Sequence, residues 1–324
     1  MSIAARFAGA ALSLGLLAQS LPAHADTYPS RPVRMVVTVE AGGAADATAR
    51  FLAKQLSAQA KQPYVVENRP GISGMVAVQR VSNAKPDGYT LLYAADGLAM
   101  APLLVPGQPV NIEKDITPIT IVGVSPFVFA VNPKVPVKTP KELVDYIKTH
   151  PNGFKWGIGG IGVAGQLAIE RFSSLAGIHA LEVPYKGNGP SIVAALSGEV
   201  DGIAALPAGL KPLIDSGKLI GLGVANAQKI ETLPNVPTVA SFGYPGFEAL
   251  SWFGVWGPKN MPADLAETVR KQVAQAIQSP DLQKEFTRIG FTLKVSDSPA
   301  DFGTYFKSEI DKDSEIMKKI NMKH

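Results

Sequence analysis

The sequence predicts an α/β fold in which parallel sheets are covered by helices on both faces. Short β-type runs alternate with amphipathic helical windows almost throughout the chain, as they do in βαβ units. In the first unit an apolar run at 35–39 and a glycine turn precede a helix. The apolar residues of that helix recur on one face, at Ala45, Ala49, Leu52 and Leu56. Runs at 64–66 and 89–94, with a short helix at 75–81 between them, complete a βαβαβ core.

The middle of the chain repeats this plan and predicts a second α/β lobe. We expect strands at 154–158, 180–183, 200–204 and 219–224, with helices that begin at Ala164, Ser191 and Lys211. The clearest helix start is at Thr139, whose hydroxyl can cap the third amide of the helix. Pro140 suits the first helical position, and Glu142 can reach back to the cap.

Two aromatic β-type runs, at 127–131 and 252–256, are predicted to cross between the lobes. The chain would leave the first lobe near Ser125 and return near Ser251, so that terminal helices from 263 and 299 pack on that lobe. This layout assigns residues 26–125 and 251–324 to lobe 1 and residues 126–250 to lobe 2. Two crossover strands make a hinge, and hinged closure around a ligand follows from it.

The first 25 residues are predicted to be a signal peptide. Arg6 precedes an apolar run at 7–18, and Ala23 and Ala25 form a small-x-small cleavage signal, so the mature protein should begin near Asp26. No later stretch reaches the ~20 apolar residues that a spanning helix needs. We therefore expect an exported, periplasmic protein, and a chain of 324 residues is long enough for two domains.

The composition excludes several classes of protein. The chain has no cysteine, which removes disulfides, thiolate nucleophiles and cysteine metal sites. Its net charge of +4 is small and not clustered, so nucleic-acid binding is not indicated. No two histidines of the mature chain have the spacing of a metal pair, and no catalytic triad can be assembled. We expect a monomer with no metal, no cofactor and no catalytic residue.

Ligands of parallel sheets bind beyond the carboxyl ends of the strands, where loops lead into helix N-termini. Four glycine-bearing loops follow predicted strands, at 41–46, 94–97, 159–165 and 185–189. Glycine lets the backbone approach a ligand, and a helix N-terminus carries about half a positive charge on its free N–H groups. Because such loops occur in both lobes, they predict a site for a carboxylate that needs no arginine.

One motif leaves an enzyme open as the alternative. Gly157, Gly159 and Gly162 fit the dinucleotide fingerprint after a strand, with Glu182 further along the chain. A single match is weak in a chain with 31 glycines, and an exported protein has no ready supply of nicotinamide cofactor. The alternative is therefore an NAD-dependent or other small-molecule enzyme that uses the 157–162 loop, whereas the favoured reading is a binding protein that does no chemistry.

Five blocks of the sequence, in the same order, resemble the Bug/TctC family: residues 28–34, 66–71, 86–92, 183–187 and 233–239. That family comprises the periplasmic receptors of tripartite tricarboxylate transporters. The resemblance runs from about Tyr28 to the C-terminus. It implies a two-lobed type II periplasmic-binding-protein fold that closes around a small carboxylate-bearing solute and delivers it to membrane permease subunits.

The resemblance also implies a ligand site. Members of the family hold the ligand carboxylate largely through backbone amides and waters from loops of both lobes. In lobe 1 the matching positions are Ala41, Gly42, Gly43, Asp46, Ala95 and Asp96. In lobe 2 they are Gly160, Gly162, Val163, Ala164, Lys186 and Ala205.

The first loop departs from the family pattern of prolines, three glycines and a threonine. The replacements are Thr38, Glu40, Ala41, Ala44 and Ala45, and Ala205 stands where many relatives carry Asp or Asn. An anion about 4 Å from Glu40 would cost roughly 4 kcal/mol at an effective dielectric near 20, more than the ~0.3 to 2 kcal/mol that one helix terminus returns. We expect Glu40 to point away, to pair with a cation, or to face a ligand that is not polyanionic. The departures favour a monocarboxylate, an aromatic acid or a zwitterion over citrate.

Overall fold

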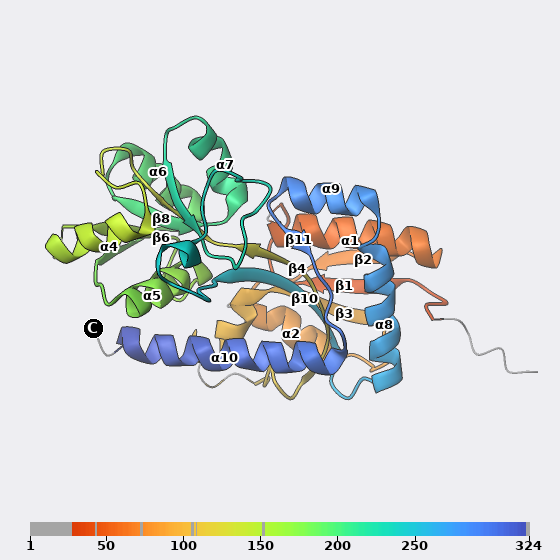
Figure 1. Ribbon diagram of the computed structural model, residues 1–324. Coiled ribbons are helices and arrows are strands. Elements are labelled where there is room, and N and C mark those ends of the chain that lie inside the picture. The colour runs from red at the N-terminus through yellow and green to blue at the C-terminus, as the bar shows by residue number, and fades with distance from the viewer. Residues whose placement is uncertain are drawn as a thin grey trace, which may run out of the picture. The chain divides into compact units, whose positions relative to one another are not determined.

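The computed structural model describes residues 28–42, 44–71, 74–104, 107, 109–150 and 153–321. The predicted signal peptide and its predicted cleavage point near Ala25 lie outside the described residues, as does Gly43. From Arg31 onward the strands gather into two sheets (Figure 1).

Six strands form the first sheet, in the order β11-β4-β10-β3-β1-β2. They are β1 (Val33–Val37), β2 (Tyr64–Asn68), β3 (Thr90–Ala95), β4 (Ile116–Pro126), β10 (Leu250–Pro258) and β11 (Thr292–Leu293). β1 pairs in parallel with β2 and β3, which is the predicted βαβαβ core. β10 runs antiparallel to both β3 and β4.

Five strands form the second sheet, in the order β7-β6-β8-β5-β9. They are β5 (Val128–Val131), β6 (Lys155–Ile158), β7 (Leu181–Pro184), β8 (Gly202–Ala205) and β9 (Ile220–Val224). β6 pairs in parallel with β7 and β8, whereas β5 is antiparallel to β8 and β9. The predicted α/β architecture is confirmed, but the sheets are mixed rather than parallel, because the strands that follow each crossing run against their neighbours.

Each sheet carries its own helices, and we call each sheet with its helices a lobe. Lobe 1 has α1 (Ala44–Ala60), α2 (Met75–Ser82), η3 (Asp96–Met100), α3 (Ala101–Leu104), α8 (Ala263–Ala276), α9 (Pro280–Arg288) and α10 (Pro299–Asn321). Lobe 2 has α4 (Pro140–Thr149), α5 (Ala164–Ala176), α6 (Asn188–Ser197), α7 (Pro207–Asp215) and η4 (Val239–Phe242). Helices α6 and α7 begin three and four residues earlier than the sequence predicts.

β4 is the longest element that the sequence analysis missed. Its eleven residues include Pro118, Gly123 and Pro126, which argue against a central strand because proline lacks the N–H that a ladder needs. In the sheet, the ladder between β4 and β10 shifts register near Pro118 and again near Gly123. These irregularities let a strand that contains proline and glycine sit between two others.

The two connections between the sheets are hydrogen-bonded to each other at Phe127. The Phe127 N–H donates to the Ala249 carbonyl at 3.0 Å, and the Ala225 N–H donates to the Phe127 carbonyl at 2.8 Å. Ala225 follows β9 and Ala249 precedes β10, so the outward and the returning chain meet at one point. The predicted hinge of two crossovers therefore has its backbone groups paired.

α10 covers lobe 1 through aromatic contacts. Phe302 packs edge-on against Trp252, and Phe306 packs against Trp256, both on β10. The final helix thus packs on the first lobe, as predicted. None of the helices in the described part of the chain combines the length and the apolar character that crossing a membrane requires.

The N-cap of α4 gives a direct test of the local fold. The Thr139 hydroxyl accepts the Glu142 N–H at 3.1 Å, and Glu142 accepts the N–H of Lys138, one residue before the expected partner, at 2.7 Å. Thr139→Ala should therefore lower the free energy of unfolding in urea by about 1 kcal/mol. The control is Thr304→Ala, which removes an exposed hydroxyl from within α10 and should change it by less than about 0.5 kcal/mol. Equal losses of unfolding free energy in Thr139→Ala and Thr304→Ala would contradict the capping role of Thr139.

Candidate functional site

A cavity of about 410 Å³ lies between the two lobes. Its lobe 1 wall comes from the loops that follow β1, β2 and β3, and its lobe 2 wall comes from the starts of α5 and α6 and the residue before α7. The volume is in the range of ordinary small-molecule sites. Both walls are formed at the carboxyl ends of strands, which is where the sequence places a ligand.

The lobe 2 wall is centred on the first turn of α5. Val163 is the N-cap in an extended conformation, and the N–H groups of Ala164 and Gly165 have no acceptor among the described residues. The Gly162 N–H is already used, because it donates to Gln166 Oε1 at 2.6 Å. Gln166 in turn donates to Glu182 Oε2 at 2.6 Å, so the loop before the helix is fixed by side chains.

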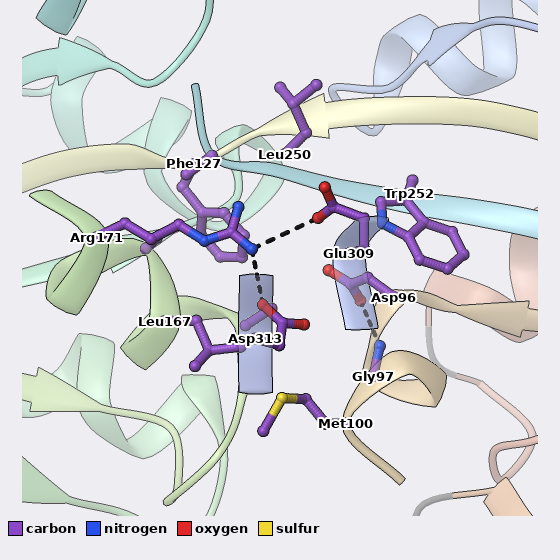
Figure 2. A pocket seen from close by; sticks show the side chains of 13 residues that line it. Asp96, Gly97, Met100, Phe127, Leu167, Arg171, Leu250, Trp252, Glu309 and Asp313 are labelled. Atoms are coloured by element: carbon purple, nitrogen blue, oxygen red, sulfur yellow. Dashed lines mark hydrogen bonds and ion pairs between the residues drawn. The ribbon is translucent and has the colours of Figure 1, made fainter. Parts of the chain in front are cut away.

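The lobe 1 wall includes Ala95, Asp96 and Gly97, at the end of β3. The Gly97 N–H donates to Asp96 Oδ1 at 2.9 Å, and Asp96 Oδ2 is buried without a hydrogen-bond partner. Burial raises the pKa of Asp96 to about 7, and hydrogen bonds from Ser251 and from the Gly97 N–H limit the rise. Figure 2 shows the Asp96 carboxyl beside Glu309, in a second and smaller cavity of about 20 Å³.

Asp46 holds the first loop rather than lining the cavity. Its carboxylate accepts the Gly42 N–H at 3.0 Å, the Asn68 side-chain amide at 2.9 Å and the Arg50 guanidinium at 2.9 Å. The hydrogen bond from Arg50, opposed by burial and helped by those from Gly42 and Asn68, lowers the pKa of Asp46 to about 2. Asp46 therefore remains ionised and fixes the turn that leads into α1.

The structure brings five of the predicted site residues together around the cavity: Ala95, Asp96, Gly162, Val163 and Ala164. Six others do not line it: Ala41, Gly42, Asp46, Gly160, Lys186 and Ala205. Ala41, Gly42 and Lys186 are exposed, and Ala205 is buried in the core of lobe 2. Gly43 lies outside the described residues.

Sequence reasoning missed several lining residues, and each carries a signal that could have identified it. Thr38 directly follows β1, and Asn188 lies in a glycine loop already singled out, at the start of α6. Phe127 and Ser251 lie at the two crossings between the sheets. A hinge residue is necessarily near both lobes, so the crossing points themselves predict lining residues.

The charge on the walls limits the chemistry. Among the described residues that line this cavity only Asp96 is ionisable, and none of them is a lysine, arginine or histidine. Glu40 is exposed and does not line the cavity. In the described chain no three His, Asp or Glu side chains are grouped to hold a metal ion. The walls supply backbone N–H groups, hydroxyls, one amide and apolar surface, which suits binding.

Known proteins resemble this chain over most of its length. Residues 48–322 match TctC, the tripartite tricarboxylate transporter family receptor. Protein BugT of Bordetella pertussis is 34% identical over 85% of each chain. The structure of R. palustris Rpa4515 with adipate has a TM-score of 0.75 and 29% identity, over 90% of this chain and 97% of that one. MatC of Rhodopseudomonas palustris with bound malate has a TM-score of 0.72 and 26% identity, over 89% and 99%.

These proteins are receptors and not enzymes, so the NAD-dependent alternative has no support. In the structure the Glu182 carboxylate accepts a hydrogen bond from the Gln166 side chain, so it is already paired within lobe 2. The match covers the lobe 2 strands, the hinge and the final helix. This chain belongs to the tripartite tricarboxylate transporter receptor family, the Bug/TctC proteins, and it is a solute-binding receptor of that periplasmic family.

Proposed function

We propose that the cavity between the lobes binds a small solute through one carboxylate, held by the N–H groups that begin α5. The observation that supports this most is that Ala164 and Gly165 line the cavity and their N–H groups have no acceptor among the described residues. A helix N-terminus attracts an anion, and each such interaction contributes about 0.3 to 1 kcal/mol at an exposed site and more when water is excluded. Asn188 of α6 and Ser251 of β10 also line the cavity and can add hydrogen bonds.

The ligand class we favour is a monocarboxylate, an aromatic acid or a zwitterion. The departures in the first loop and at Ala205 do not carry this choice. Glu40 is exposed, and Ala45 and Ala205 are buried away from the cavity, while Thr38, which does line it, is polar. The support comes from the walls themselves. They present apolar side chains at Val39, Leu98, Leu104, Phe127, Val163 and Leu206. Citrate would bring three negative charges to walls that offer no cation and one carboxyl group, that of Asp96. A citrate carboxylate about 4 Å from an ionised Asp96 would be repelled by roughly 4 kcal/mol at an effective dielectric near 20.

The same proposal covers the cellular setting. We propose that the chain is exported, is cleaved near Ala25 and acts as a monomer that delivers its solute to the permease subunits of a tripartite tricarboxylate transporter. The two lobes would comprise residues 26–125 with 251–324 and residues 126–250. The positions of the two sheets support these bounds, since β4 ends at Pro126 and β10 begins at Leu250.

Calorimetric titration with a panel of acids tests the ligand class. The panel contains benzoate, butyrate, glutamate, adipate, malate and citrate. We expect a monoacid or the zwitterion to bind at least about tenfold more tightly than citrate, which corresponds to about 1.4 kcal/mol. Tight binding of citrate together with no binding of any monoacid or zwitterion would contradict the proposal.

A proline at the first position of α5 tests the role of the backbone. Ala164→Pro removes one N–H but leaves the helix intact, because proline is tolerated at that position and Val163 already has the extended conformation that a following proline requires. We expect the carboxylate affinity to fall about tenfold or more, as a lost hydrogen bond to a charged group costs about 1.5 to 3 kcal/mol.

Ala263→Pro is the matched control, since Ala263 holds the same position in α8, follows the extended Pro262 and lies far from the cavity walls. Thermal unfolding shows whether both variants fold. If Ala164→Pro folds and binds its acid as tightly as Ala263→Pro, the N–H groups of α5 do not hold the ligand.

A further inference from the structure

Helix α5 is tied to the C-terminal helix of the other lobe two turns after it leaves the ligand cavity. Arg171 of α5 places Nη2 at 2.7 Å from Asp313 Oδ1 and at 3.5 Å from Glu309 Oε2, both on α10 (Figure 2). Ala164 and Leu167 of the same helix line the smaller cavity beside these three side chains. The helix that begins at the ligand wall therefore makes an ionic contact with lobe 1 along its length.

These ion pairs differ from the others in the described chain. All the other ion pairs there join residues within one lobe, whereas those of Arg171 join lobe 2 to lobe 1. They are also shielded from water: the side chains are 19% exposed for Arg171, 9% for Glu309 and 7% for Asp313. Shielded pairs are screened by salt much less than surface pairs, and removing one partner leaves an uncompensated charge.

An apolar contact lies along the same line between the helices. Leu167, one turn before Arg171, packs with Met317, one turn after Asp313, and with Met100 at the end of η3. The two helices thus meet through an ionic layer and an apolar layer. Such a contact must be broken if lobe 2 swings away from lobe 1.

We propose that Arg171, Glu309 and Asp313 form an interlobe clasp that holds α5 against α10 and favours the closed arrangement of the two lobes. The clasp does not touch the ligand. It acts by positioning the first turn of α5, so that Ala164 and Gly165 face the lobe 1 wall across the cavity. The effect on ligand affinity rests on the proposed function, whereas the effect on the distance between the lobes does not.

The charges around the clasp are unbalanced, which gives it a pH dependence. Three carboxyl groups face one guanidinium: Asp96 from η3 and Glu309 and Asp313 from α10, with Lys312 paired to Glu309 at 2.8 Å and the neutral phenol of Tyr305 nearby. Burial, opposed by Arg171, raises the pKa of Asp313 to about 6, and burial raises that of Asp96 to about 7.

The direction of this pH dependence follows from which arrangement of the lobes binds the protons more tightly. An acid whose pKa is raised in the closed arrangement holds a proton there at pH values at which the hydrated, open arrangement has released it. Closure is therefore favoured as the pH falls through about 7 toward 5 and disfavoured as it rises toward 8. Removing Arg171 takes away the cation that opposes the rise in the pKa of Asp313, so the pH dependence becomes steeper.

The absence of cysteine from the sequence allows a clean test. Lys54→Cys on α1 and Lys148→Cys on α4 place two spin labels at exposed positions, one in each lobe. Pulsed electron–electron double resonance then gives the distance distribution between the lobes from pH 5 to 8, without ligand. We expect a larger population at long distances at pH 8 for Arg171→Met than for the parent, and a partial return toward the parent at pH 5.

Two further variants distinguish the loss of the clasp from a general loss of protein stability. Arg270→Met removes a guanidinium that is 14% exposed and is paired with Glu267 within lobe 1, and it should leave the distances unchanged. Asp313→Asn added to Arg171→Met removes one uncompensated buried charge, and it should shift the distances at pH 8 back toward the parent. Thermal unfolding confirms that each variant folds.

The affinity is measured with adipate and with benzoate as probes. Arg171→Met should weaken at pH 8 the binding of whichever probe the parent binds, by about 5- to 150-fold, the usual range of coupling between distant sites. If the parent binds neither probe, the affinity comparison uses the acid of the calorimetric panel that it does bind, and the distance measurements test the clasp independently. Identical distance distributions in the parent and Arg171→Met at every pH would overturn the proposal, as would an equal shift in Arg270→Met or no recovery with Asp313→Asn.

Discussion

The rest of the structure depends on the first turn of α5, where two N–H groups reach the ligand cavity with no acceptor of their own among the described residues. A helix start with unpaired donors is unfavourable unless water or an anion satisfies it. The chain fixes this turn firmly. Gly162 has a left-handed φ of 75° and donates to Gln166, and a side chain at Gly165 would place its Cβ 2.9 Å from the Ala204 carbonyl oxygen. The donors are therefore rigid before any ligand arrives.

Rigid donors are useful only if the opposite wall can approach and withdraw. The paired backbone at Phe127 permits this, because only two connections join the sheets and both pass through that point. The large aromatic contacts lie within each lobe, as those between α10 and β10 show. The side-chain contacts between the lobes are smaller. Leu104 lies against Gly162 beside the cavity, Gly290 lies against Pro207, and Leu167 packs with Met100 and Met317. Such an arrangement can hinge without disturbing either core.

Much of this could be predicted from the sequence. The alternation of strands and helices gave both lobes, and the aromatic runs at 127–131 and 252–256 located the crossings, because these signals are local. The sequence analysis did not predict β4, because its prolines and glycine are accommodated by bulges against β10, and these depend on the pair of strands rather than on local sequence. The family resemblance assigned Asp46 of the first loop to the ligand, but its hydrogen bonds from Asn68 and Arg50 depend on how β2 packs beside α1. The Arg171 clasp joins residues far apart in sequence and has no local pattern at all.

If the N–H groups at the start of α5 grip the carboxylate of the ligand, the amide signals of Ala164 and Gly165 report its binding. They can be followed by nuclear magnetic resonance while an acid that calorimetry shows to bind is titrated into the protein. We expect both amide protons to move downfield in proportion to the bound fraction, more than those of Ala263 and Asp264 at the start of α8. Saturated binding with these two signals unmoved would contradict it.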